Sequence, residues 1–205
     1  NTLYYVTDET LSRVTFDPFA VTHEKSVNYP YEFGFPLVDD ARNRVVVPRE
    51  DTDADNDTVI QSYSSTNLAQ GASSTLSTDP FLLITGVYND AGTRAYAIAS
   101  DTPGLLRFDV ENGVYLGTIN LTSLQENPEW IVKDPTENTA YLLKSNRIIE
   151  LDLDTETVVQ QNYLSTAIDP DVAVVDHAGQ YLYTDGAVYN QGDLIRIRLS
   201  DLSLV

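Results

Sequence analysis

Four aspartates alternate with other residues in one short segment, and their spacing is the clearest chemical signal in the sequence. They are Asp51, Asp53, Asp55 and Asp57. Alternate carboxylates in a curled loop converge on one centre and suit Ca²⁺, which takes about six to eight oxygen ligands. Asn56 stands where such loops favour glycine, and Ser62 stands where they carry a bidentate glutamate. The segment predicts a weak calcium site, and the alternative is a solvated acidic loop. No pattern for haem or nucleotide binding accompanies it.

Aromatic and acidic residues surround four prolines that recur along the chain, at Pro30, Pro80, Pro128 and Pro170. Proline at the first position of a strand loses no ladder hydrogen bond, so these positions predict where inner strands begin. An aromatic and acidic rim suits a sugar or peptide ligand. The candidate ligand-binding residues are Tyr31, Glu32, Phe81, Glu129, Trp130 and Asp171. The alternative is that the prolines only begin strands.

Catalytic patterns are missing from the sequence. His23 and His177 are the only histidines, and no spacing pairs either of them with a nucleophile. Cysteine is absent, which excludes a thiolate nucleophile and a cysteine-ligated metal. We therefore expect no catalytic residues.

The net charge of −19 limits the classes of partner. Such a surface repels nucleic acid and anionic lipid, and it suits cation binding and a setting outside the cell. No run of about 18 apolar residues is present, so we expect no membrane insertion.

The elements that must position these residues follow a repeated pattern, clearest at 134–161. A turn at 134–138 leads to a strand at 140–143, a tight corner leads to a strand at 147–153, and a turn precedes the next strand. Apolar and charged residues alternate in 147–153, as in a half-buried antiparallel strand. Similar turns begin at Asp39, Asn89 and Asp176.

We divide the chain into repeats 1–28, 29–78, 79–126, 127–168 and 169–205 within one domain. Equivalent positions, which we expect to be buried, are Leu11, Val59, Leu105, Ile148 and Leu194, separated by 48, 46, 43 and 46 residues. A period in the forties with about four short strands predicts an all-β propeller of four-stranded antiparallel blades, whereas a β-sandwich would not explain the repeat. About four and a half blades are recognisable, because the first repeat lacks an inner strand. We expect an incomplete ring, closed by the rest of the propeller or by another chain.

Two of the repeats resemble the YVTN-type β-propeller family. The resemblance rests on 4–7 with 11–17, and more strongly on 140–159, where Asp152, Thr155 and Val158 match the family pattern. Tyr63 and Arg198 stand at the position of Asp152 in the second and fifth repeats and depart from that pattern. The resemblance implies a bacterial or archaeal surface or secreted propeller. Lactonase-like and quinoprotein-like enzymes share the architecture.

Two functions remain open on these grounds. The first is a non-catalytic binding or adhesion module that is extracellular, on the cell surface or periplasmic, with a protein or carbohydrate ligand at the face where the inner strands begin. The second is a fragment of a propeller enzyme of the lactonase or quinoprotein dehydrogenase type. A channel lined by histidine and carboxylates would favour the enzyme.

Overall fold

The computed structural model of the chain describes residues 2–6, 10–16, 18, 19–26, 36–39, 42–51, 57–77, 83–99, 104–112, 114–121, 127–186 and 194–205. Within these ranges the secondary structure is β-strand and turn, with no α-helix. Among the same residues no helix is long and apolar enough to cross a membrane.

The strands form five antiparallel sheets in chain order. The first sheet contains β1 (Thr2–Val6), β2 (Thr10–Phe16) and β3 (Phe19–Ser26). The second contains β4 (Leu37–Asp39), β5 (Arg44–Asp51), β6 (Asp57–Ser64) and β7 (Gln70–Ser77). The third contains β8 (Leu83–Tyr88), β9 (Arg94–Ala99), β10 (Leu105–Asp109) and β11 (Val114–Ile119).

The fourth and fifth sheets complete the described part. The fourth contains β12 (Trp130–Lys133), β13 (Thr139–Lys144), β14 (Arg147–Asp152) and β15 (Thr157–Tyr163). The fifth contains β16 (Ile168–Asp176), β17 (Tyr181–Gly186) and β18 (Leu194–Arg198). The middle three sheets therefore have the predicted four strands, whereas the first and fifth have three.

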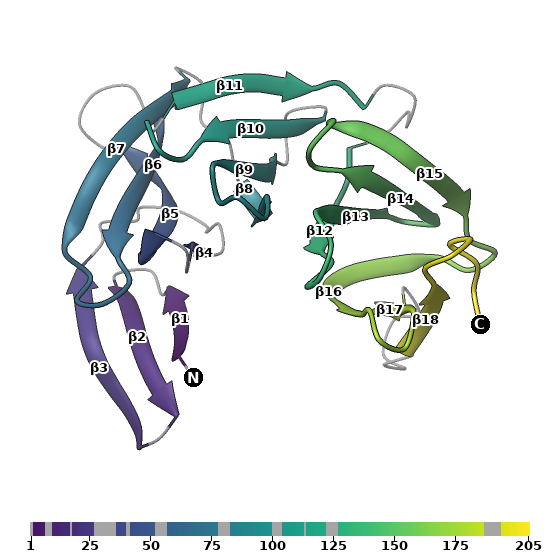
Figure 1. Cartoon of the computed structure of the whole chain (residues 1–205), viewed down its shortest axis with the longest axis horizontal. Coiled ribbons are helices and arrows are strands. Elements are labelled where there is room, and N and C mark those ends of the chain that lie inside the picture. The colour runs from purple at the N-terminus through teal and green to yellow at the C-terminus, as the bar shows by residue number, and fades with distance from the viewer. Residues whose placement is uncertain are drawn as a thin grey trace.

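The sheets follow one another along an open arc, and the first and last sheets lie at its two ends (Figure 1). No described strand of the first sheet pairs with a strand of the fifth. Consecutive four-stranded sheets with their inner strands side by side are the blades of a β-propeller. The prediction of an all-β propeller is confirmed, and five sheets are roughly compatible with the predicted four and a half blades.

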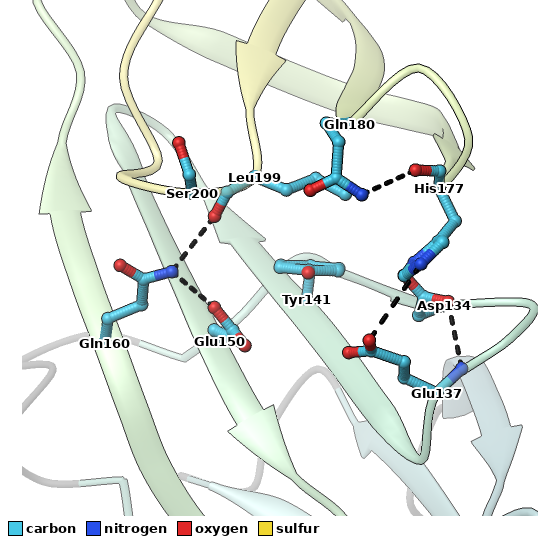
Figure 2. Close-up of a pocket in the computed structure, with 9 residues that line it drawn as sticks. All are labelled: Asp134, Glu137, Tyr141, Glu150, Gln160, His177, Gln180, Leu199 and Ser200. Atoms are coloured by element: carbon cyan, nitrogen blue, oxygen red, sulfur yellow. Dashed lines mark hydrogen bonds and ion pairs between the residues drawn. The ribbon is translucent and has the colours of Figure 1, made fainter.

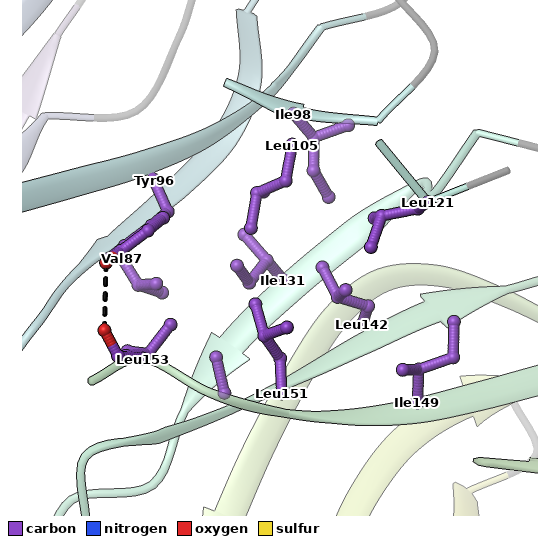
Figure 3. Close-up of a cluster of buried hydrophobic side chains, with 11 residues drawn as sticks. Val87, Tyr96, Ile98, Leu105, Leu121, Ile131, Leu142, Ile149, Leu151 and Leu153 are labelled. Atoms are coloured by element: carbon purple, nitrogen blue, oxygen red, sulfur yellow. Dashed lines mark hydrogen bonds between the residues drawn. The ribbon is translucent and has the colours of Figure 1, made fainter. Parts of the chain in front are cut away.

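Apolar side chains fill the spaces between neighbouring sheets. Tyr96, Ile98 and Leu105 of the third sheet pack against Ile149 and Leu151 of the fourth (Figure 3). On the other side of β14, Ile148 faces the fifth sheet and packs with Leu182 and Ile197. Alternate residues of one strand thus serve two different interfaces, because side chains alternate across a strand.

The equivalent positions that we expected to be buried show how burial depends on the presence of a following sheet. Leu11, Leu105 and Ile148 are all fully buried, at 0% exposure, as expected. Leu194 pairs within the fifth sheet as Ile148 does within the fourth, yet it is 73% exposed, so that prediction is wrong. It points to the side on which no described sheet follows. The side chain of Val59 lies outside the described part.

Candidate functional site

A turn follows the inner strand in each of the last four sheets. The sequence placed an aspartate or asparagine at the start of each of these turns. In the fourth sheet Asp134 Oδ1 accepts hydrogen bonds from the backbone of Thr136 and Glu137, at 2.8 and 3.0 Å. Asn89 and Asp176 accept equivalent bonds. Asp134 therefore has a structural role of its own, which fixes where its second oxygen points.

That second oxygen joins two blades. Asp134 Oδ2 lies 2.8 Å from Nδ1 of His177, in the corresponding turn of the fifth sheet. The Nε2 atom of His177 lies 3.9 Å from a carboxylate oxygen of Glu137. This pair forms between blades, 43 residues apart in the sequence, so local spacing does not reveal it.

The contact between Asp134 and His177 changes the pKa of both side chains. Burial alone would raise the pKa of Asp134, but hydrogen bonds from His177, Thr136 and Glu137 favour the carboxylate and hold its pKa below the usual range. The hydrogen bond to Asp134 raises the pKa of His177, and the nearby charges of Asp134 and Glu137 act in the same direction. The contact is thus an aspartate–imidazolium pair at mildly acidic pH.

A second contact recurs between the blades, where a donor of one sheet reaches a turn carbonyl of the next. The Tyr4 hydroxyl donates to the carbonyl of Ser65 at 2.7 Å. At the next interface Arg44 donates to the carbonyl of Val110 at 2.6 Å. The Tyr96 hydroxyl donates to the carbonyl of Leu153 at 2.9 Å (Figure 3). These carbonyls are equivalent, because the amide of each of their residues closes the same type of turn.

We call the space beside each of these turn carbonyls, between two neighbouring sheets, a slot. Between the third and fourth sheets an ion-pair network fills the slot. Glu156 Oε1 lies 2.7 Å from Nη1 of Arg94, and Oε2 bonds Nη1 of Arg107. The Tyr96 oxygen lies 3.2 Å from Glu156 Oε1. Two guanidinium groups, a carboxylate and a tyrosine hydroxyl therefore occupy one interface.

Between the fourth and fifth sheets the corresponding slot is a cavity of about 240 Å³. Tyr141 lies in the middle, with Glu150 and Gln160 on one side and Asp134, Glu137 and His177 on the other (Figure 2). Gln180, Leu199 and Ser200 complete the lining. Here the turn carbonyl, that of Leu199, accepts from Gln160 at 3.0 Å instead of from a tyrosine.

Tyr141 is consequently left without its usual bond. The residue is 4% exposed, and among the described residues its hydroxyl has no hydrogen-bond partner. Burial raises its pKa well above the ordinary value, and the negative charges of Glu150, Asp134 and Glu137 add to that effect. The cavity is thus an acidic site around the hydroxyl of a largely buried tyrosine.

Sequence reasoning did not find this site, although the repeats contain a signal for it. In four sheets a tyrosine pairs with a charged residue of the strand that follows it in the chain. The pairs are Tyr4–Arg13, Tyr96–Arg107, Tyr141–Glu150 and Tyr183–Arg196. The partner is arginine in three of them and glutamate only in the fourth sheet, so an alignment of the repeats would have marked Glu150.

The predicted calcium residues are described only in part. Asp53 and Asp55 lie outside the described residues. Asp51 ends β5 and Asp57 begins β6, and the two pair with each other in register, but their side chains are not described. Elsewhere among the described residues, no three histidine or acidic side chains form a group able to hold a metal ion. The calcium site stays a prediction.

Two of the predicted ligand-binding residues take part in contacts within the fourth sheet. Glu129 pairs with Nζ of Lys144 at 2.5 Å and accepts the backbone N–H of Ser145 at 3.2 Å, so it holds a corner. Trp130 is partly buried against the core between the fourth and fifth sheets. Tyr31, Glu32 and Phe81 lie outside the described residues, as does the side chain of Asp171.

The cavity between the fourth and fifth sheets has acceptors but no activated nucleophile. Ser200 and His177 lie on opposite sides of it (Figure 2), and no hydrogen bond joins them among the described contacts. His177 is held by Asp134 without an adjacent hydroxyl to deprotonate, whereas a nucleophile–base pair needs hydrogen-bond contact. The arrangement therefore suits binding of a polar or cationic group.

No family model matches the sequence, and no curated protein matches it, so the resemblance to the YVTN-type family is not confirmed. Solved structures do resemble the fold. Dihydro-heme d1 dehydrogenase NirN in complex with DHE has a TM-score of 0.70 at 14% identity, over 100% of this chain and 42% of that chain. A chain of the mitotic checkpoint complex has a TM-score of 0.71 at 9% identity, over 100% of this chain and 61% of that chain.

A third similar structure is the extracellular domain of a putative one component system, BT4673, from B. thetaiotaomicron. Its TM-score is 0.70 at 10% identity, over 100% of this chain and 28% of that chain. The chain therefore spans less than two thirds of each of these three proteins. At such low identities the likeness shows the propeller fold and nothing about activity.

Proposed function

We propose that this chain is an interaction module: a non-catalytic β-propeller of the cell exterior that binds other proteins through its two outer blade faces. The observation that carries the proposal is the exposed apolar surface at both ends of the arc. An antiparallel sheet is stable with one face in water, but exposed apolar patches of this kind mark protein interaction sites.

The outer face of the fifth sheet has the composition of an interface between blades. Val172, Val174 and Leu194 are exposed on it, with Leu194 at 73%. Tyr183 and Arg196 pair across the same face, as Tyr96 and Arg107 do where the third sheet meets the fourth. This face therefore offers both apolar area and hydrogen-bond donors to a further sheet.

The outer face of the first sheet is also apolar. Leu3, Phe16, Phe19 and Val21 are exposed there, and Phe19 reaches 75%. Phe16 and Phe19 pair across β2 and β3, with ring centroids 6.2 Å apart. We infer that further β-sheets cover both faces, from the rest of a larger propeller or from another chain. The greater lengths of the similar propellers support this inference.

Two further points favour binding over catalysis. In the cavity between the fourth and fifth sheets, His177 bonds an aspartate, and no described hydroxyl bonds it. The net charge of −19 suits a soluble protein in the saline conditions outside a cell. The predicted surface around Glu129 and Trp130 remains a proposed second contact for a protein or carbohydrate ligand.

A second copy of the chain is a suitable probe for the outer faces, because it carries sheet faces of both kinds. We expect the molar mass measured by sedimentation velocity to rise with protein concentration. The double substitution Val174→Asp with Leu194→Asp should abolish this rise, since it places two charges on the fifth sheet's outer face. Both residues are exposed, so folding should be retained.

The matched control is Val159→Asp, which adds a charge at an exposed valine in β15, away from the end faces. It should associate like the unmodified chain. A chain that stays monomeric at every concentration, or one that associates equally after the double substitution, would overturn the proposal.

A further inference from the structure

We propose that the cavity between the fourth and fifth sheets binds a guanidinium group, supplied by an arginine side chain of a partner or by a small guanidino compound. The site is independent of the outer faces, since it lies between two sheets that are both present in this chain. The equivalent position one blade earlier, between the third and fourth sheets, holds different charged residues.

The earlier slot shows which group is missing. In the third sheet Arg107 pairs with Tyr96, and its guanidinium fills the slot and bonds Glu156. In the fourth sheet the residue paired with Tyr141 is Glu150, so a carboxylate stands where the chain would otherwise place a guanidinium. The fold is conserved between the two slots, but the cation is absent from the second.

The glutamate that binds the arginines between the third and fourth sheets also has no counterpart between the fourth and fifth sheets. Glu156 and Leu202 occupy the same turn position in consecutive sheets, with backbone φ values of 58° and 53°. Leu202 is fully buried in the apolar core and offers no carboxylate. The carboxylates that line the cavity between the fourth and fifth sheets therefore all come from the fourth sheet and its turn.

Three acceptor groups line that space. The Tyr141 hydroxyl has no partner among the described residues, and only one oxygen of Glu150 is bonded, by Gln160. Directly paired residues have Cβ atoms about 5 Å apart, so one planar group can reach both. Glu137 lies on the far side of Tyr141 (Figure 2) and adds a third acceptor. A guanidinium has five N–H donors in a rigid plane and matches such a set.

Charge and size agree with this ligand. Asp134, Glu137 and Glu150 line the cavity, and His177, already paired with Asp134, is the one basic residue among the described residues that line it. Water occupies about 30 Å³ per molecule in the liquid, so a cavity of about 240 Å³ has room for several groups of that size. Hydrogen bonds between a cation and a carboxylate are among the strong ones in proteins.

The test uses blocked tripeptides of glycine with a central arginine, citrulline or lysine, titrated into the intact chain by calorimetry. Citrulline has the shape of arginine without its charge, so we expect the arginine peptide to bind at least about tenfold more tightly. Ethylguanidinium distinguishes the sources: affinity equal to that of the arginine peptide indicates a small guanidino ligand, and weaker affinity indicates an arginine side chain.

Substitutions locate the binding. Glu150→Gln should weaken the arginine peptide about tenfold or more, and Tyr141→Phe should weaken it without changing the melting temperature. Glu111→Gln removes the same charge from an exposed turn of another sheet and should have no effect. Equal affinity for arginine and citrulline, undiminished affinity in Glu150→Gln, or no binding of any guanidinium probe would overturn the proposal. None of these results depends on association through the outer faces.

Discussion

Replacing tyrosine by phenylalanine at equivalent positions of neighbouring sheets should have different effects on stability. The Tyr96 hydroxyl is fully buried and donates to the carbonyl of Leu153 at 2.9 Å. Loss of one such hydrogen bond costs about 0.5–1.5 kcal/mol, and a buried acceptor left without a partner costs about 1–3 kcal/mol. We expect Tyr96→Phe to lower the free energy of unfolding by about 1–3 kcal/mol.

The same substitution at Tyr141 removes a hydroxyl that bonds none of the described residues. We expect its effect on the free energy of unfolding to stay within about 0.5 kcal/mol. Tyr4→Phe provides an intermediate case, because Tyr4 bonds Ser65 but is only partly buried. The three variants therefore rank the interfaces by one common chemical change.

Urea unfolding followed by the fluorescence of Trp130, the single tryptophan, is the suitable assay. The product of the slope and the shift in midpoint gives the change in free energy, provided that the slope is unchanged. Thermal unfolding gives an independent check, at about 2–4 °C for each kcal/mol in a chain of this size. Equal losses in Tyr96→Phe and Tyr141→Phe would refute the assignment of hydrogen bonds between blades.

Three further outcomes are expected. Leu151→Ala should cost about 2–5 kcal/mol in urea unfolding, whereas Leu194→Ala should cost less than about 0.5 kcal/mol; similar losses would contradict the packing. The raised pKa of His177 stabilises the fold below about pH 6.5, and this contribution is lost as the pH rises through the pKa of His177 in the folded protein. The lowered pKa of Asp134 stabilises the fold above about pH 3.9, and this contribution is lost as the pH falls through the pKa of Asp134 in the folded protein. His177→Gln should remove the decline on the alkaline side in melting temperatures measured against pH, and an unchanged profile would exclude the pair. Calcium should raise the melting temperature at about 10⁻⁴–10⁻³ M, and Asp53→Ala should abolish that shift; equal shifts in both proteins would place the calcium elsewhere.

The strands and turns could be predicted because they depend on local sequence. Alternation of apolar and charged residues gave β14, and the aspartate at each turn gave positions such as Asp134 and Asp176. Both signals act over a few residues, through the geometry of a strand and through side-chain hydrogen bonds to the nearby backbone.

The site could not be predicted in the same way, because it depends on how two sheets meet. Asp134 and His177 are in different repeats, and their contact requires the turns of adjacent blades to be level with each other. The exposure of Leu194 has a similar cause: its strand resembles the strand of Ile148, and only the neighbouring sheet differs. Burial in a repeat protein is a property of the interface between units.

The two ends of the arc are unlike each other, which makes any contact between copies heterologous. The fifth sheet presents Tyr183 and Arg196, and the first presents Phe16 and Phe19. Two copies joined end to end would contain ten sheets in their described parts, five from each, whereas propeller rings contain about 4–8 blades. Such a contact does not close, so each added copy leaves one free face of each kind. An uncovered chain would therefore grow into an open filament, and covering just one of its two faces would be enough to stop that growth.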